Sequence, residues 1–392
     1  MKIPTDIAGS LAAAFERHAD EGRQPRLASG ATAKGVDTDL RRHDEVRAAG
    51  LSRRHALSGM AALGVFSQYG PARAAKTYDP PGTLLDAAKK DGQLILYTAA
   101  FPEVMQDVIS DFNKRFPFVR VNMVRASGGQ LITRVQSEAA SGKLEADVLD
   151  HSDRGQTKGI EDLFADYAPP NAADYMESAL VSPKLWPTIT PAWSIAWNPE
   201  IVKDPPRSWA ALCDPKYTGQ IGQVIGPSGG TTWTRVMFER QVLGEDYWAK
   251  QAAVKPKLFP SGAPLSDAVV RGEISIAPLI FNIVYPKKQA GAPIDAVYPS
   301  DGVPISPYGS GIMKSAKHPA AAKLWMDWCL SDEGQTQSIR DQGNLTSLKS
   351  PPVKPVGFDP ARDKLWTPDF KQFQTLHDAW LEDWNKAYGY RQ

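Results

Sequence analysis

The sequence has few cysteines, almost no net charge and no obvious membrane anchor. Its two cysteines, Cys213 and Cys329, are too few for a disulfide framework, and we expect them to stay unpaired in the core. The net charge of +1 gives no reason to expect nucleic acid or a membrane surface as a partner. The modest apolar run 59–66 is far shorter than the roughly 18 residues that a membrane span needs. The 392 residues are enough for two domains with ordinary cores.

The first 74 residues have the features of an export signal preceded by an unfolded segment. Residues 1–50 carry many charges of both signs and one aromatic residue, so we expect a disordered or over-extended N-terminus. Residues 51–74 contain the pair Arg53-Arg54, the apolar run and a small-residue cleavage pattern ending at Ala74, which is typical of a twin-arginine signal. Ala56 stands where such signals usually carry a bulky apolar residue, so general secretion remains an alternative. Either route predicts a periplasmic protein whose mature chain begins near residue 75.

Strands and helices alternate in the first part of the mature chain. Strand-like runs at 93–98, 119–124 and 147–151 are separated by helical patterns, which predicts an α/β lobe with a mainly parallel sheet. Ligands of such sheets bind beyond the carboxyl ends of the strands. The rule selects the loops that follow these three strands, and from them we take as candidate ligand-binding residues Thr98, Ser127, Gly128, Gly129 and Ser152.

The stretch 226–235 is the most informative part of the chain. It follows a short strand-like run, contains a Ser-Gly-Gly turn and opens a helical pattern, so unpaired backbone N–H groups and the helix dipole meet there. This arrangement suits a phosphate, phosphonate or carboxylate. A near-copy lies at 127–129, and two such corners suggest two lobes that face one cleft. The candidates here are Ser228, Gly229, Gly230, Thr231 and Thr232.

Two extended runs, 188–197 and 303–313, read as crossings between the lobes. We therefore predict a first lobe of residues 75–192 plus 309–392 and a second lobe of 193–308, joined by two hinge strands. An amphipathic helix is expected at 370–386. Trp193, Asn282 and Tyr308 are the residues that we expect to orient the part of a ligand beyond its anionic group.

Several motifs resemble family 1 extracellular solute-binding proteins of ABC importers, and they keep that family's order over about residues 90–350. They are Trp197-Asn198-Pro199, Pro206-Arg207-Ser208-Trp209, Asp214–Ile221, Arg271–Ile274, Ala316–Lys323 and Leu330–Gln335. The resemblance implies an α/β, two-lobed periplasmic-binding-protein fold of type II. It also implies a monomer that closes on a small solute, serves an inner-membrane permease with its ATPase, and has no catalytic residues and no cofactor.

Members of this family carry ferric iron, thiamine, polyamines, phosphonates or sugar phosphates. The iron binders use a tyrosine pair, but only Tyr285 stands at the matching place here, so we expect no metal site. Polyamines need carboxylates and aromatic faces, for which Asp150, Asp153 and Trp193 are candidates. Thiamine needs stacked aromatic rings, for which the candidates are Trp193, Phe281 and Tyr308. The two Ser-Gly-Gly corners favour a small anionic solute such as a phosphonate, a phosphate ester or a carboxylate.

Two other classes of function remain as alternatives. A hydrolase needs a nucleophile beside a base, and His151 between Asp150 and Asp153 is the one cluster of that kind, although the chain has no Gly-x-Ser-x-Gly elbow. A hydrogen-bonded loop histidine is the simpler interpretation. A sensor that presents its bound ligand to a receptor has the same sequence features as a transport protein. We expect no enzymatic activity.

Overall fold

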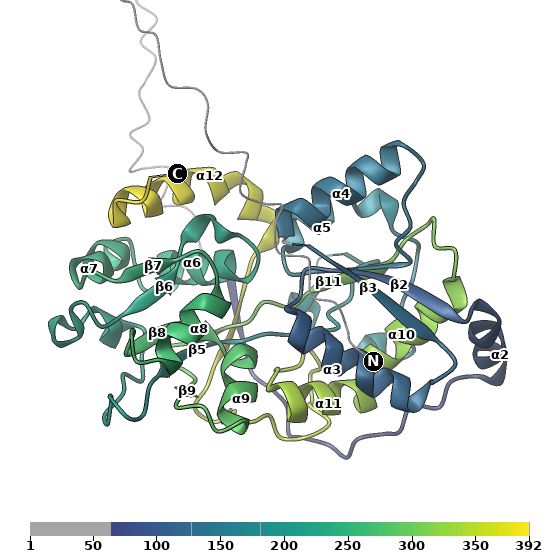
Figure 1. The fold of residues 1–392 in the computed structure, drawn as a ribbon, viewed down its shortest axis with the longest axis horizontal. Helices are drawn as coiled ribbons and strands as arrows, with labels where there is room; N and C mark the ends of the chain where they lie inside the picture. Colours follow the sequence, from purple (N-terminus) through teal and green to yellow (C-terminus); the bar gives the residue numbers. More distant parts are fainter. Residues whose placement is uncertain (1–63, 127, 181, 392) are drawn as a thin grey trace, which may run out of the picture. The chain divides into compact units, whose positions relative to one another are not determined.

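In the computed structural model, which describes residues 64–126, 128–180 and 182–391, the first lobe is built around a four-stranded sheet (Figure 1). Its order is β11–β4–β2–β3, where β2, β3 and β4 run parallel and β11 is antiparallel to β4, as predicted for a mainly parallel sheet. The carboxyl ends of the three parallel strands therefore meet at one edge. The strands are β2 (Gln93–Thr98), β3 (Arg120–Arg125), β4 (Val148–His151) and β11 (Gly309–Ile312).

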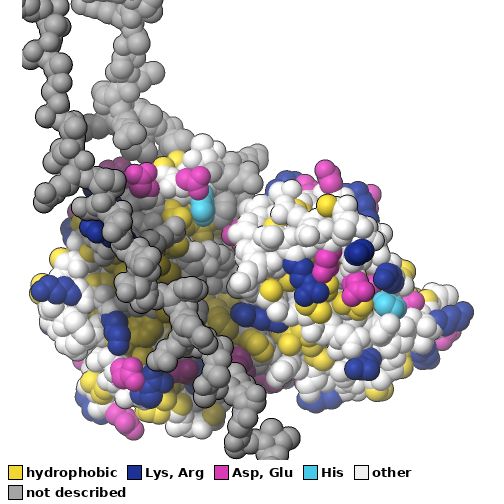
Figure 2. All heavy atoms as spheres, turned by 45° about the horizontal axis from the view of Figure 1, so that its top comes forward, with side chains coloured by type: hydrophobic (Ala, Val, Ile, Leu, Met, Phe, Trp, Pro, Cys, Tyr) yellow, Lys and Arg dark blue, Asp and Glu magenta, His cyan; other side chains and the backbone are white. Residues whose placement is uncertain are grey.

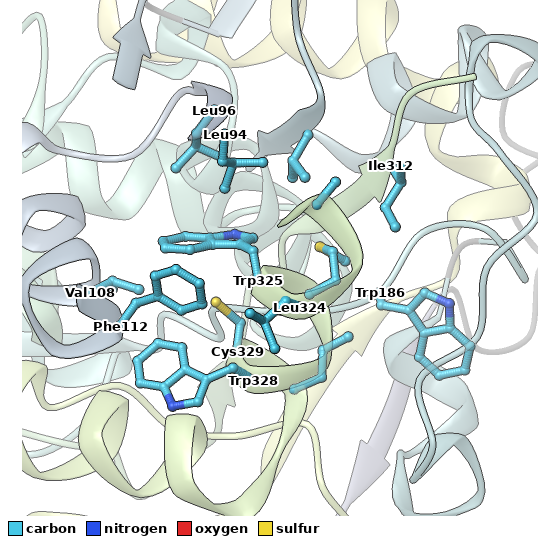
Figure 3. Packing of buried hydrophobic residues seen from close by; sticks show 14 of the residues in the cluster. Leu94, Leu96, Val108, Phe112, Trp186, Ile312, Leu324, Trp325, Trp328 and Cys329 are labelled. Atoms are coloured by element: carbon cyan, nitrogen blue, oxygen red, sulfur yellow. The ribbon is translucent and has the colours of Figure 1, made fainter. Parts of the chain in front are cut away.

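Helices cover this sheet with the apolar faces that the sequence pattern predicts. Trp325 and Trp328 of α10 both pack against Phe112 of α3, in the same buried cluster as Leu94 and Leu96 of β2 (Figure 3). Burial of these large side chains contributes to the lobe's hydrophobic stabilisation. The helices are α2 (Gly82–Asp91), α3 (Pro102–Arg115), α4 (Gly128–Ala140), α5 (Arg154–Gly159), α10 (Pro319–Leu330) and α11 (Asp332–Gln342).

The second lobe contains two small sheets. In one, β5 lies between β8 and β9 and is antiparallel to both; in the other, β6 and β7 are parallel. The strands are β5 (Trp193–Trp197), β6 (Gly222–Val224), β7 (Lys257–Phe259), β8 (Ile276–Ile280) and β9 (Asp295–Val297). The helices are α6 (Thr231–Val242), α7 (Tyr247–Ala253), α8 (Gly262–Val270) and α9 (Phe281–Gln289). Short 3-10 turns occur at Glu161–Leu163, Ala172–Asp174, Glu177–Ala179, Ala210–Cys213, Pro215–Tyr217 and Gly226–Ser228.

The C-terminal elements pack with the second lobe, whereas the sequence prediction placed them with the first. α12 (Phe370–Tyr388) lies beside α7 and α6 in Figure 1, and its Trp380 and Trp384 are buried in the aromatic core of the second lobe. β12 (Leu365–Pro368) pairs in parallel with β10 (Val303–Pro304). The i, i+4 spacing of the two tryptophans marks the buried face of the helix, but it does not indicate which lobe that face contacts.

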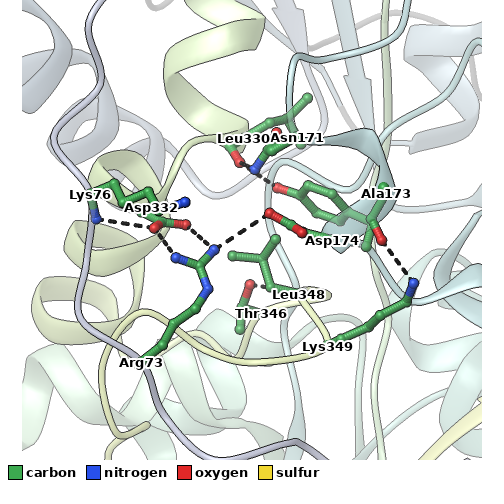
Figure 4. A network of polar contacts seen from close by, with 11 residues as sticks. Arg73, Lys76, Asn171, Ala173, Asp174, Leu330, Asp332, Thr346, Leu348 and Lys349 are labelled. Carbon is green, nitrogen blue, oxygen red and sulfur yellow. Dashed lines mark hydrogen bonds and ion pairs between the residues drawn. The ribbon is translucent and has the colours of Figure 1, made fainter.

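The N-terminal part of the described chain is built into the fold. β1 (Gly64–Ser67) pairs antiparallel with β12, and Tyr69 is buried beside Phe358. Arg73 forms an ion pair with Asp332 at the start of α11, and Asp174 lies nearby (Figure 4). Residues 1–63, including Arg53-Arg54, lie outside the described residues, whereas residues 64–74, the remainder of the predicted export signal, are described and form these contacts. A mature chain that began near residue 75 would lack β1 and the Tyr69 contact.

Three segments lie together where the lobes join. Thr190 pairs with Leu345, and Ala192 pairs with Ile305, so the two predicted crossings are adjacent and the chain near 345 runs beside them. This third segment was not expected, because its residues show no strand-like alternation. None of the helices within the described ranges is long and apolar enough to span a membrane. Acidic and basic side chains are interspersed over the described surface that Figure 2 shows.

Candidate functional site

A cleft of about 400 Å³ opens between the two lobes and is lined by residues from both of them. This volume is in the range of small-molecule binding sites. On the first-lobe side, the loops after β2, β3 and β4 reach the cleft because these parallel strands end at one edge. On the second-lobe side, the loops after β6 and β7 reach it for the same reason, since Val224 pairs with Phe259.

The corner at 226–232 is the best-defined part of the cleft. Gly229 and Gly230 have positive φ angles of 69° and 56°, which turn the chain sharply before α6 begins at Thr231. Among the described residues, the backbone N–H groups of Gly230 and Thr231 have no hydrogen-bond acceptor. The hydroxyl-bearing residues Ser228 and Thr232 line the cleft with them. The predicted geometry of this corner, a strand, a glycine turn and a helix N-terminus, is confirmed.

The structure contains a third corner of the same kind, which the sequence pattern did not predict. Pro260-Ser261-Gly262 follows β7, opens α8 and lines the same cleft. Gly262 packs so closely that an added Cβ would lie 2.8 Å from Cδ1 of Ile283. The Ser-Gly dipeptide just before a helical pattern was the available signal. It was hard to see because the preceding strand has three residues.

The first-lobe corner is held in place by a histidine. Gly128 and Gly129 line the cleft at the start of α4, while Ser127 lies outside the described residues. Nδ1 of His151 accepts a hydrogen bond from the N–H of Asp153 at 2.9 Å, so the proton of the neutral ring is on Nε2. That Nε2–H donates to the carbonyl of Gly128 at 2.9 Å. His151 therefore links the β4 loop to the glycine corner.

The side chain of Trp193 contacts the second-lobe corner and holds it in place. Its indole N–H donates to the carbonyl of Thr231 at 3.0 Å, and the guanidinium of Arg235 lies 5.3 Å from the centre of its ring. Arg235 also donates to the carbonyl of Val224, where β6 ends. A buried ion pair with Glu239 holds the arginine itself. The core thus fixes both ends of the corner.

The charges that face the cleft are of one sign. Arg125, at the end of β3, lines it and is exposed, whereas no aspartate or glutamate of the described chain does so. Tyr308 and Ser152 lie beside Arg125. Burial, with a smaller effect from Asp150, raises the pKa of Tyr308, while its hydrogen bond to Ser152 and the charge of Arg125 oppose that rise. Arg125 was missed because one arginine at a strand end has no distinguishing pattern.

Two of the predicted residues do not line the cleft. The Thr98 hydroxyl donates to the carboxylate of Asp150 at 2.9 Å, and Thr188 and Ser310 donate to the same group. Burial raises the pKa of Asp150, and these hydroxyl donors counter the rise. Asn282 is buried and donates to the side chain of Asn344 at 2.9 Å. The other predicted residues that the structure describes all line the cleft: Gly128, Gly129, Ser152, Trp193, Ser228, Gly229, Gly230, Thr231, Thr232 and Tyr308.

The cluster that suggested a hydrolase is engaged in structural contacts. Asp150 binds hydroxyls, and Asp153 caps α5 by accepting from the N–H of Gln156. His151 contacts backbone groups and no carboxylate side chain in the described structure. No group of three or more His, Cys, Asp or Glu residues in the described ranges is placed to hold a metal ion. The described residues of the site include donors that could bind a ligand, and this cluster does not place a nucleophile beside a base.

Comparison with known proteins decides the family. Residues 97–336, more than half of the chain, match the bacterial extracellular solute-binding protein family. The chain belongs to this family. An uncharacterized protein of Haemophilus influenzae is 30% identical to this solute-binding protein over 192 residues, which cover 47% of the chain and 55% of that relative. The match therefore spans about half the length of that curated relative.

Solved structures of periplasmic binding proteins share the fold of this solute-binding protein. AfuA from Actinobacillus pleuropneumoniae, solved with fructose-6-phosphate bound, has a TM-score of 0.63 and 23% identity, covering 76% of this chain and 99% of AfuA. Iron-bound HitA from Pseudomonas aeruginosa has a TM-score of 0.58 and 21% identity, covering 74% and 99%. At these identities the likeness shows the fold alone, and the predicted type II periplasmic-binding-protein fold is confirmed. The family and these neighbours bind substrates; they are not enzymes.

Proposed function

We propose that the protein captures a small anionic solute in the interlobe cleft and delivers it to an inner-membrane ABC permease driven by an ATPase. The solute class is a phosphate ester, a phosphonate or a carboxylate. The observation that supports this most directly is the cleft lining, in which Arg125 and the free N–H groups of Gly230 and Thr231 occur without a described carboxylate. Each hydrogen bond from such donors to a charged group contributes about 1.5–3 kcal/mol.

The other cargoes have less support from the same residues. A ferric ion needs several anionic oxygen ligands, yet Tyr308 is the one tyrosine among the described cleft residues. Tyr285, at the place where iron binders carry their pair, stacks on Phe281 at a centroid distance of 5.7 Å. A polyamine would bring positive charge to Arg125 with no described carboxylate to balance it. Phe281, a candidate for stacking on thiamine, packs in the core between the lobes.

Binding measurements test the proposal directly. We expect thermal stabilisation of the purified protein by phosphate, phosphate esters, phosphonates or small carboxylates, because a ligand that binds the native state alone raises its stability. Ferric citrate and spermidine are the comparison ligands. Stabilisation by ferric citrate but by none of the anions would contradict the proposal.

Arg125→Gln is expected to lower the affinity for the stabilising anion by about tenfold, because one charged donor is lost from the cleft. Isothermal titration calorimetry gives the dissociation constants. Arg120→Gln is the matched control, because Arg120 is exposed at the other end of the same strand and does not line the cleft. The affinity of this variant for the anion should equal that of the wild type. An equal loss in both variants would assign the effect to general charge instead of the site.

A further inference from the structure

The cleft has an apolar wall in addition to its polar corner. On the second-lobe side, two strands and a helix contribute apolar side chains that are all at most 9% exposed. They are Val224 at the end of β6, Leu279 and Ile280 at the end of β8, and Ile283 in the first turn of α9. The wall belongs to the same cavity as the free N–H groups of Gly230 and Thr231. A ligand held by that corner therefore places its remaining atoms near hydrocarbon.

The wall is continuous with the third corner. A Cβ atom on Gly262 would lie 2.8 Å from Cδ1 of Ile283 and 3.7 Å from Cδ2 of Leu279, so backbone and side chains already touch there. This close approach leaves no gap for a polar group between the helix start and the wall. Pro260 and Phe101 add further apolar surface from the two lobes. The apolar surface is thus a lining of the cavity and not a scatter of single residues.

Two amide side chains at or near the cleft are engaged in other contacts. The amide of Gln156 donates to Asp153 at 3.0 Å, and Asn282 turns away to Asn344. The hydroxyl-bearing residues Ser228, Thr231, Thr232 and Ser261 also line the cleft, but they stand at the glycine corners and not among the four apolar residues. A hydroxyl placed against the wall would lose its hydrogen bonds to water without replacement.

We infer, on the basis of the proposed function, that the solute combines one anionic head with a compact apolar remainder, as in an aryl or alkyl phosphate or phosphonate. The head binds at the glycine corner beside Arg125, and the remainder lies against the wall formed by Val224, Leu279, Ile280 and Ile283. The phosphate of a polyhydroxylated ester could bind at the glycine corner, but its hydroxyl groups would not suit the apolar wall.

Three probes with a common head test this inference on the purified full-length protein: inorganic phosphate, phenyl phosphate and fructose 6-phosphate. Calorimetry should give phenyl phosphate a dissociation constant at least about tenfold below those of the other two, because its ring leaves water for the wall. If fructose 6-phosphate binds as tightly as phenyl phosphate or more tightly, the inference is overturned and the anion function stands. If none of the three phosphates binds, the inference is overturned, and the proposed function then depends on whether a phosphonate or a carboxylate stabilises the protein.

A matched pair of variants tests the wall itself. Ile283→Thr keeps the branch at Cβ but replaces the ethyl group by a hydroxyl. It should weaken the binding of phenyl phosphate by about fivefold while leaving the binding of inorganic phosphate unchanged. Ile201→Thr, at an isoleucine of the same lobe that is 49% exposed and does not line the cleft, should change neither affinity. Equal weakening of both probes by Ile283→Thr would overturn the inference. If that variant does not fold, as judged by circular dichroism, the three-probe comparison on the wild type decides.

Discussion

Replacing Arg235 by methionine is expected to lower the free energy of unfolding by about 3–5 kcal/mol, because it leaves the carboxylate of Glu239 buried without its partner. The side chains of Arg235 and Glu239 are 0% and 1% exposed. The distance from Nη1 of Arg235 to Oε1 of Glu239 is 2.9 Å. The arginine also donates to Gln223 and to the carbonyl of Val224, and the indole of Trp248 donates to Glu239. Urea denaturation of wild type and variant measures the loss.

Two further variants separate the buried charge from ordinary loss of contacts. Arg235→Met combined with Glu239→Leu removes both charges, so it should recover much of the stability that the single variant loses. Arg134→Met breaks a pair with Glu138 at the same i, i+4 spacing on α4, where the side chains are 45% and 21% exposed, and should cost at most about 1 kcal/mol. Equal losses in the buried and exposed single variants would contradict this account.

The same substitution should also weaken ligand binding. Arg235 lies under the ring of Trp193, and Trp193 in turn holds the carbonyl of Thr231 at the start of α6. Trp384 of α12 packs beneath Gly226, where an added Cβ would lie 2.9 Å from its ring. The glycine corner therefore rests on the aromatic core of the second lobe. The same contacts therefore stabilise the core and hold the glycine corner in position.

Local pattern was enough to predict the elements and two of the three glycine corners. A strand, a Ser-Gly turn and a helix are short-range signals, and β2, α4, α6 and α7 lie close to where the sequence places them. The common edge of parallel strands then brings the loops together. For this reason most of the predicted binding residues that the structure describes line one cleft.

What the sequence could not indicate depends on contacts between distant residues. Asn282 follows a strand that ends at the cleft, but its partner is Asn344, and nothing near 282 shows that pairing. Thr98 stands at a strand end too, yet it serves the buried carboxylate of Asp150. The position of α12 is set by the core that receives Trp380 and Trp384. Side-chain orientation and lobe assignment therefore needed coordinates.

Replacing Gly230 by alanine is expected to lower the affinity for the anionic ligand by about a hundredfold or more. Gly230 has φ 56° and ψ −130°, a conformation that costs a residue with a Cβ about 1–3 kcal/mol. The new Cβ would also lie 2.7 Å from Oγ of Ser152 on the opposite lobe. Relief of this strain moves the free N–H groups of Gly230 and Thr231, and each is worth about 1.5–3 kcal/mol to a bound anion. Calorimetry with the anion that stabilises the wild type measures the change.

Gly291→Ala controls for backbone strain, since Gly291 has φ 84° but no atom within 4 Å of an added Cβ, and it does not line the cleft. It should cost about 1–2 kcal/mol of stability and leave the affinity unchanged. Adding Ser152→Gly to the Gly230→Ala variant removes the contact between the lobes but not the strain at the corner, so it should restore only part of the affinity. Full restoration would mean that contact across the cleft, and not the direction of the two N–H groups, limits binding. Wild-type affinity in the Gly230→Ala variant would remove the glycine corner from the anion site altogether.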